Sequence, residues 1–161
     1  MQISFEQSDV TIHDLPAVPV AIVKHRGDRS GLAETIRRFR EWRTAAGIKP
    51  EASSTFMLFR SERSPQNPAD YSVDICAETR EPFVSDGSVE AGVIPAGRCA
   101  VLRYPGNTNN LEPAFQFLYQ DWLPASGEEP RDLPSYSRRR LSFIPEVSAH
   151  EVIVEAFLPL K

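Results

Sequence analysis

The sequence has few of the features that mark secreted, membrane-spanning or metal-binding proteins. Its 161 residues include only two cysteines, Cys76 and Cys99, and these lack metal-ligand spacing, so we expect neither a disulfide framework nor a metal site. No apolar run approaches the ~20 residues of a membrane span. The N-terminus has no basic start followed by an apolar core, so no secretory signal is expected. The reducing cytoplasm is therefore the expected compartment.

The charge and the placing of glycines and serines argue against three further classes of protein: nucleic-acid binders, proteins with a phosphate-binding loop, and serine hydrolases. The formal net charge is −4, which argues against direct nucleic-acid binding because such domains carry a basic surplus. Gly27 and Gly31 are isolated and form no phosphate-binding loop, and no serine stands in a nucleophile-elbow context. We therefore expect no cofactor. The chain is long enough to bury a sizeable core.

A repeated segment is the main positive signal. The run 21–27, Ala-Ile-Val-Lys-His-Arg-Gly, returns as Ala-Val-Leu-Arg-Tyr-Pro-Gly at 100–106. Each copy leads into a helix-periodic stretch, then a tryptophan, then a glycine. Such self-similarity indicates two copies of one structural unit. We predict a single domain, 1–161, whose repeats cover about 8–80 and about 88–161.

Each copy is predicted to fold as β-α-β-β. The first has a strand over 10–23 that is interrupted around 14–19, a helix with an apolar face from Leu32 that ends before Gly47, and strands over 55–60 and 71–78. The second has a strand over 89–104 that is interrupted at 95–97, a helix with caps at 108–110 that ends at Gly127, and strands over 141–144 and 152–160. The predicted fold class is α+β, a tandem duplication with antiparallel sheets, one helix backing each, and a pseudo-twofold groove between the copies.

Glu155 is the residue of greatest functional interest. It interrupts the apolar run Val152–Leu158, and a carboxylate buried there must find a partner or have its pKa raised. We therefore expect it to face a ligand. The alternative is a structural ion pair with Arg98 or Arg103.

Asp74 occupies the matching place in the first copy when the last strands are aligned. Two acids in symmetric positions would line one groove. The alternative is that Asp74 is a solvated charge at a sheet edge.

Aromatic residues cluster around the same elements, and they suit a pocket for flat or cationic ligands. The candidates are Tyr104, Trp122, Tyr136, Phe59 and Phe157. For Trp122, which lies on a helical stripe, core packing is the alternative. The run Arg138-Arg139-Arg140 is interpreted as solvated surface.

These segments resemble a known family. The residues that carry the resemblance are 19–27, 94–101, 118–127, 131–136 and the ending 154–161, Val-Glu-Ala-Phe-Leu-Pro-Leu-Lys. They are similar to the GyrI-like small-molecule-binding domain, the effector-binding domain of AraC-type and multidrug-sensing regulators, here as a stand-alone member.

The resemblance implies two fused β-α-β-β modules around a groove for amphipathic or cationic compounds, with Glu155 reaching into it and Phe157 where the family often has tyrosine. The sequence departs from the family pattern at two places that matter for the ligand. The first weakens the expected preference for cations, and the second makes one wall of the groove more apolar. Ser137 and three arginines follow Tyr136, where the family often carries a glutamate, and the tyrosine-rich second strand is replaced by Phe56-Met57-Leu58-Phe59.

The predicted function is small-molecule binding in which Glu155 orients the ligand. One alternative, which some family members exemplify, is hydrolysis of reactive cyclopropane-type toxins, with Glu155 as general base at a raised pKa. Another is a protein-interaction module, such as a DNA gyrase modulator or a regulator partner, that uses Arg37, Arg38 and Arg40.

Overall fold

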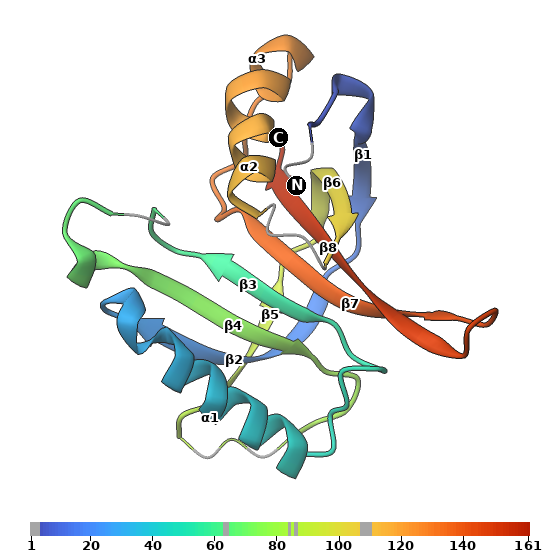
Figure 1. The fold of residues 1–161 in the computed structure, drawn as a ribbon. Coiled ribbons are helices and arrows are strands. Elements are labelled where there is room, and N and C mark those ends of the chain that lie inside the picture. Colours follow the sequence, from blue (N-terminus) through green and yellow to red (C-terminus); the bar gives the residue numbers. More distant parts are fainter. Residues whose placement is uncertain (1–3, 63–64, 84, 86, 107–110) are drawn as a thin grey trace. The chain divides into compact units, whose positions relative to one another are not determined.

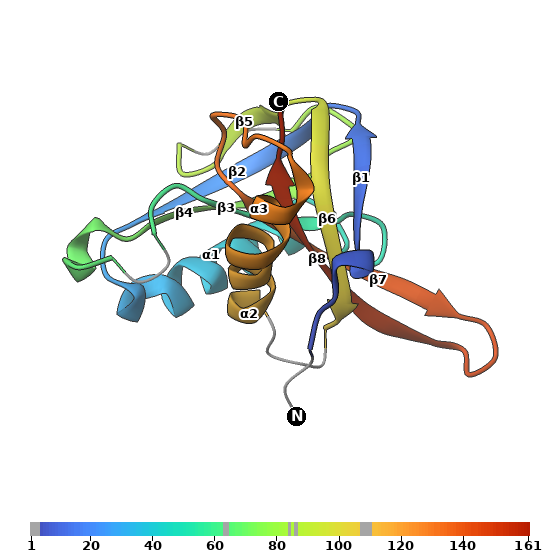
Figure 2. The same ribbon diagram turned by 90° about the horizontal axis from the view of Figure 1, so that it is seen from above.

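The computed structural model describes residues 4–62, 65–83, 85, 87–106 and 111–161. Contacts divide the chain into two units: unit 1 combines Met1–Pro16 with Ala96–Lys161, and unit 2 is Ala17–Pro95. Each unit contains a four-stranded antiparallel sheet with helical segments against one face (Figures 1 and 2). The predicted α+β class with a helix backing each sheet is confirmed.

Unit 2 forms around a strand whose central residues are all buried. Its strands, in spatial order, are β5 (Glu90–Ile94), β2 (Val18–Arg26), β4 (Ser72–Glu78) and β3 (Thr55–Phe59). The five central residues of β4, Asp74 among them, are buried, so this strand is covered on both faces. The short helices η2 (Arg29–Gly31) and η3 (Pro68–Asp70) lie in its connections.

Helix α1 (Leu32–Ala45) covers one face of this sheet. Phe39 on α1 packs against Ala21 and Val23 of β2 and against Ile75 and Ala77 of β4. These sheet residues alternate along their strands, so they share one face. Burying this apolar face is the main stabilising contribution that the sequence pattern predicts.

Unit 1 has the corresponding order of strands. They are β1 (Val10–Leu15), β6 (Gly97–Pro105), β8 (Ala149–Pro159) and β7 (Tyr136–Ile144). Its helical segment consists of α2 (Leu111–Gln116), the π-helical η4 (Phe117–Trp122) and α3 (Leu123–Ser126), and η1 (Gln7–Asp9) precedes β1. The segment ends at Gly127, whose φ of +76° is the left-handed cap predicted from the sequence.

The first strand of each predicted copy belongs to the sheet of the other copy. β1 pairs with β6, and β5 pairs with β2. The interruptions predicted around 14–19 and at 95–97 are the places where the chain passes from one unit to the other. Pro16 and Pro95 stand at these two points and cannot donate ladder hydrogen bonds. The shared strand order accords with two repeats, although a duplication stays a prediction.

Strand β7 is longer than the sequence pattern predicts. It begins at Tyr136, five residues before the predicted start at Leu141, because Arg138 and Arg140 pair in register with β8 instead of forming a solvated run. The helix caps predicted at 108–110 lie outside the described residues. Within the described residues, no helix is long and apolar enough to cross a membrane.

Candidate functional site

Glu155 lies in the middle of β8 with arginines on both neighbouring strands. The register places it opposite Arg103 of β6 and opposite Arg138 of β7. Residues in register share a face of the sheet, and we call this face of unit 1 the Glu155 face. The Glu155 side chain is only 2% exposed.

Three guanidinium groups bind this one carboxylate. Arg138 donates from Nε at 2.9 Å and from a terminal nitrogen at 2.6 Å to Oε1 of Glu155. Arg140 donates to the same oxygen at 3.3 Å, and Arg103 donates to Oε2 at 3.2 Å. Of the two structural partners weighed from the sequence, Arg103 is thus confirmed. Arg98 is wrong, because it pairs with Glu128 at 3.0 Å.

The arginines change the acidity expected for Glu155. Burial alone would raise the pKa of its carboxyl group, but the charge and hydrogen bonds of Arg138, together with Arg103, outweigh burial and leave the pKa below its usual value. Of the two outcomes expected for a carboxylate buried in an apolar strand, a partner or a raised pKa, the structure shows the partner. A carboxylate with a lowered pKa is a weaker base, so this geometry does not favour the general-base role.

An aromatic pair lies beside the carboxylate on the same face. Tyr136 and Phe157 are opposite each other in register and stack with ring centroids 4.7 Å apart and an interplanar angle of 8°. The Arg138 guanidinium lies over the Phe157 ring at 5.6 Å, a cation–π contact. Burial raises the pKa of Tyr136, whose hydroxyl is 3.7 Å from Sγ of Cys99. We call Glu155, Arg103, Arg138, Arg140, Tyr136 and Phe157 together the Glu155 site.

The other two aromatic candidates of unit 1 lie elsewhere. Tyr104 alternates with Arg103 and so points to the opposite face of the sheet. There it packs near Phe5, with ring centroids 6.4 Å apart, and Phe5 in turn packs near Phe117 of η4 at 5.9 Å. Trp122 ends η4 and is buried. Neither is placed beside Glu155, and both fit the role of helix-side core.

Unit 2 holds a related but smaller cluster around Asp74. This carboxylate is 1% exposed, so the alternative of a solvated edge charge is wrong. Arg60 donates to Oδ2 at 2.7 Å, and Arg26 approaches Oδ1 within 2.9 Å. Asp74 is in register with Lys24 of β2 as Glu155 is with Arg103 of β6. Each central strand thus buries an acid beneath basic side chains.

Phe59, the last candidate, does not lie on the face of Asp74. It pairs with Val73, and odd-numbered β4 residues such as Ile75 and Ala77 face α1. Of the seven candidates, the structure thus brings together Glu155, Phe157 and Tyr136. It places Asp74 and Phe59 in unit 2, on opposite faces of the sheet.

Sequence reasoning missed Arg138 and Arg140 as site residues. The signal was present, because alternate residues of a strand share one face. Had β7 been predicted to start at Tyr136, both arginines would have fallen on the face of Tyr136. The sequence does not show the register of β7 against β8, which places both arginines beside the carboxylate of Glu155.

Unit 2 also contains a cavity and a buried histidine. The cavity, of about 600 Å³, is lined by residues of β2, of α1 and of the stretch 87–90 that leads into β5, including Lys24, Trp42 and Glu90. The buried His25 bonds to Thr35 Oγ1 at 2.8 Å and to two backbone carbonyls, a packing role.

Among the described residues, no group of His, Cys, Asp or Glu is arranged to hold a metal ion.

Comparison with known proteins agrees with this architecture. A family model described as the GyrI-like small molecule binding domain matches residues 8–161. The chain belongs to this family. The GyrI-like chain is also 33% identical over 128 residues to "Probable transcriptional regulator YgiV" of Escherichia coli (strain K12), covering 78% of this chain and 80% of that protein.

Solved structures show the same fold at lower sequence identity. The GyrI-like chain superposes on the EcmrR C-terminal domain with a TM-score of 0.71 and 17% identity, covering 94% of this chain and 96% of that one. It also superposes on SAV2435 bound to tetraphenylphosphonium with a TM-score of 0.59 and 10% identity, covering 94% and 93%. The assignment to the GyrI-like family therefore rests on the family model and the relative YgiV, and the solved structures add the likeness of fold.

Proposed function

We propose that this GyrI-like domain binds an amphipathic aromatic compound at the Glu155 site. The observation that carries the proposal is the buried carboxylate that holds three partly exposed arginines beside a stacked aromatic pair. A small number of fixed polar groups beside apolar surface is typical of ligand sites. SAV2435, which shares this fold, binds tetraphenylphosphonium, a cation that carries phenyl rings, so this likeness supports the aromatic character of the ligand and not the sign of its charge.

In this proposal, Glu155 orients the ligand through the arginines. The carboxylate fixes Arg138 and Arg140, which are about 30% exposed, and these present their remaining N–H groups to a bound molecule. A guanidinium held by a buried carboxylate loses less side-chain entropy when it binds than a free one. Tyr136 and Phe157 give the site its apolar floor.

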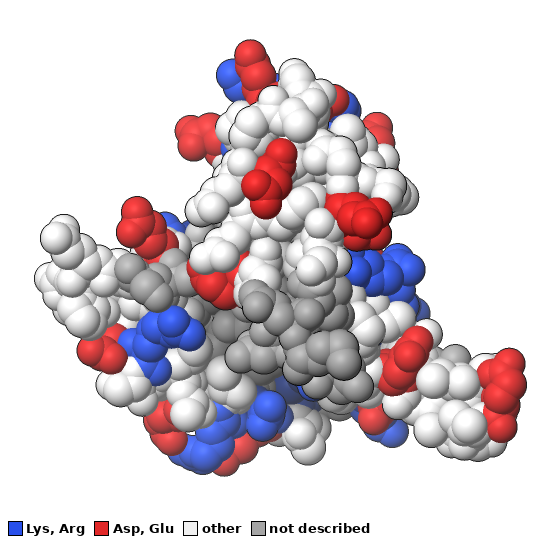
Figure 3. All heavy atoms as spheres, turned by 45° about the horizontal axis from the view of Figure 1, so that its top comes forward, with Lys and Arg blue, Asp and Glu red and all other residues white. Residues whose placement is uncertain are grey.

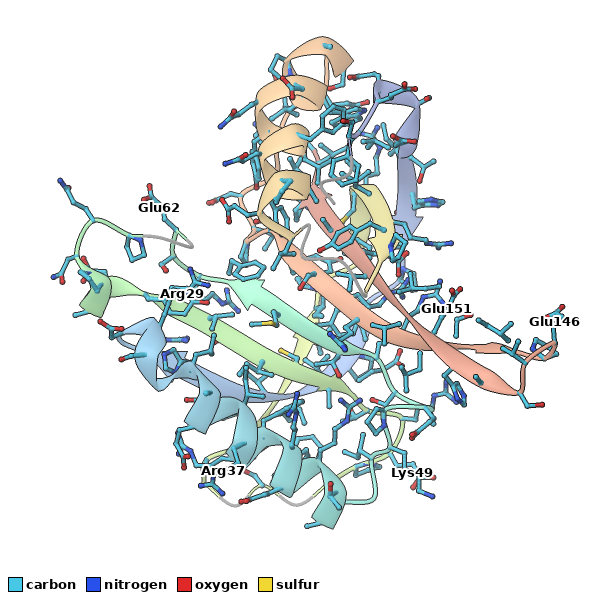
Figure 4. All side chains as sticks on the ribbon, in the orientation of Figure 1. Arg29, Arg37, Lys49, Glu62, Glu146 and Glu151 are labelled. Carbon is cyan, nitrogen blue, oxygen red and sulfur yellow. The ribbon has the colours of Figure 1, made fainter. Side chains whose placement is uncertain are left out.

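The two alternative functions, hydrolysis of a reactive small molecule and interaction with a protein partner, receive less support. The lowered pKa of Glu155 weighs against its use as the base of a hydrolase. The interaction surface expected on α1 includes Arg37, which is labelled in Figure 4 and is already paired with Glu34 and Glu41 of the same helix. A regulator or DNA gyrase as protein partner stays a prediction.

The test is a binding screen with variants that locate the site. Fluorescent aromatic dyes, rhodamine 6G and fluorescein, are titrated with protein, and anisotropy is followed. Arg138→Gln removes the residue that joins the carboxylate to the aromatic pair. Arg139→Gln is the matched control, because Arg139 is exposed and alternates to the other face of β7.

We expect at least one dye to bind, with an affinity reduced about tenfold by Arg138→Gln, the order expected for one charge-assisted hydrogen bond. Arg139→Gln should leave binding unchanged. If neither dye binds, or if both variants reduce binding equally, the Glu155 site is not the ligand site.

A further inference from the structure

The charges of the Glu155 site do not balance. Three arginines lie within 3.3 Å of one glutamate, so the cluster carries a surplus of two positive charges. Guanidinium groups keep their positive charge in proteins, so the surplus is permanent. The chain as a whole has a net charge of −4, and both signs occur over the face drawn in Figure 3. The positive surplus is thus a local property of this site.

The surplus is also directed outward. Glu155 is 2% exposed, whereas Arg103 is 59%, Arg138 30% and Arg140 29% exposed. A molecule that approaches the site therefore meets guanidinium groups first, with the carboxylate behind them. A cation would have to approach through these like charges to reach Glu155.

Acidic neighbours on β8 offset little of the charge of the arginines. The next acid on the same face of this strand is Glu151, which is exposed and lies toward the β7–β8 turn that carries Glu146 (Figure 4). Arg103 and Arg138 are in register with Glu155, so four residues, or roughly 13 Å, separate them from Glu151 along the strand, which exceeds the Debye length of about 8 Å at physiological ionic strength. Arg140, opposite Ile153, is only two residues from the register of Glu151, so the exposed Glu151 can offset the charge of Arg140 alone.

The arginines retain hydrogen-bonding capacity for a ligand. Four N–H···O contacts join them to Glu155, while three guanidinium groups offer about fifteen N–H donors in total. Within the described part of the chain, Arg103 and Arg140 each make one of these contacts. Forked N–H pairs match the two oxygens of a carboxylate.

We propose that the Glu155 site takes an anionic aromatic ligand, an arene that carries a carboxylate, in preference to a cationic one. This inference rests on the proposed function and names its ligand class. The carboxylate of the ligand binds the N–H groups that face away from Glu155. The arene stacks on the guanidinium of Arg138, which already contacts the Phe157 ring on the protein side.

The experiment uses three ligands with one skeleton and different charge: 2-naphthoate, 2-naphthalenemethanol and 2-naphthylmethylammonium. Their affinities are measured by calorimetry on the full chain at pH 7. Arg103→Gln and Arg140→Gln each remove one positive charge, and Arg139→Gln is the control on the other face of β7. Because Arg103 is largely exposed, its replacement tests the charge without threatening the fold.

We expect 2-naphthoate to bind at least tenfold more tightly than the alcohol, and the ammonium compound to bind more weakly than either. Each of the first two arginine variants should reduce the affinity for 2-naphthoate several-fold, and Arg139→Gln should not change it. Equal or tighter binding of the ammonium compound would overturn the inference but leave the proposed function standing. If none of the three binds, the proposed function itself fails.

Discussion

Replacing Glu155 with glutamine removes one negative charge from beneath three positive ones and changes almost nothing else. Glutamine has nearly the same volume, and its side-chain oxygen can still accept a hydrogen bond from Arg138. The variant therefore isolates the charge of Glu155. We expect it to destabilise the protein, because the three guanidinium groups lose their shared partner.

The size of the effect follows from the geometry. Two unit charges 4 Å apart attract by about 4 kcal/mol at an effective dielectric constant of about 20. The desolvation of the buried carboxylate offsets part of this attraction, and the largely exposed Arg103 contributes roughly 0–1 kcal/mol. Removing one partner of a buried pair typically costs about 3–5 kcal/mol. Since the arginines can turn toward water in the variant, we expect Glu155→Gln to lower the free energy of unfolding by about 3 kcal/mol, at the low end of this range.

The pH dependence gives an independent check. The folded-state pKa of Glu155 is lowered by its arginines relative to the unfolded chain. Its contribution to stability is therefore present above the unfolded pKa of about 4.3, and it is lost as the pH falls through the folded value. The difference in unfolding free energy between the wild-type protein and Glu155→Gln should shrink as the pH falls below about 4.

The assay is urea unfolding at pH 7, with thermal unfolding as a second measurement. A loss of about 3 kcal/mol corresponds to a drop in Tm of about 6–12 °C for a chain of this size. Glu151→Gln is the control, because it changes an exposed acid on the same strand and should stay within about 0.5 kcal/mol of wild type. If Glu155→Gln is as stable as Glu151→Gln at pH 7, the electrostatic account of the Glu155 site is wrong.

Two further predictions concern groups outside the site. Burial raises the pKa of the Cys76 thiol to about 12 and also raises that of Cys99, so we expect neither to react with a disulfide reagent at pH 8 until the protein is unfolded in urea; rapid reaction of the native protein would contradict this. Arg43 is buried and donates to the carbonyls of Ile48 and Ser53 at 3.0 and 2.6 Å, so Arg43→Met should cost about 2–4 kcal/mol in urea unfolding. Arg43→Lys should recover less than half of that loss, and full recovery would show that charge alone matters.

The family and the order of elements are readable from the sequence because they depend on local signals. Apolar periodicity, the glycine at 127 and the proline-marked interruptions are properties of short windows. The structure confirms the helices, the strand interruptions and the α+β class. The start of β7 is not readable in this way, because three consecutive arginines carry the same local signal as a solvated loop.

The residues of the site can be predicted only in part. Glu155 stands out because a carboxylate in an apolar run violates a local rule. Tyr136 and Phe157 are candidates from their residue type, but their stacking depends on register. Tyr104 resembles them in sequence, yet its position in the alternation of β6 places it on the helix side.

The sequence by itself determined that unit 1 buries an acid in the middle of its last strand. The tertiary structure decided what that acid does, because the pairing of β6, β8 and β7 sets which side chains surround it. A one-residue shift of β7 against β8 would turn Arg138 and Arg140 to the other face. Register is fixed by contacts between residues far apart in the chain, so the sign of the charge at this site follows from the fold and not from any single segment.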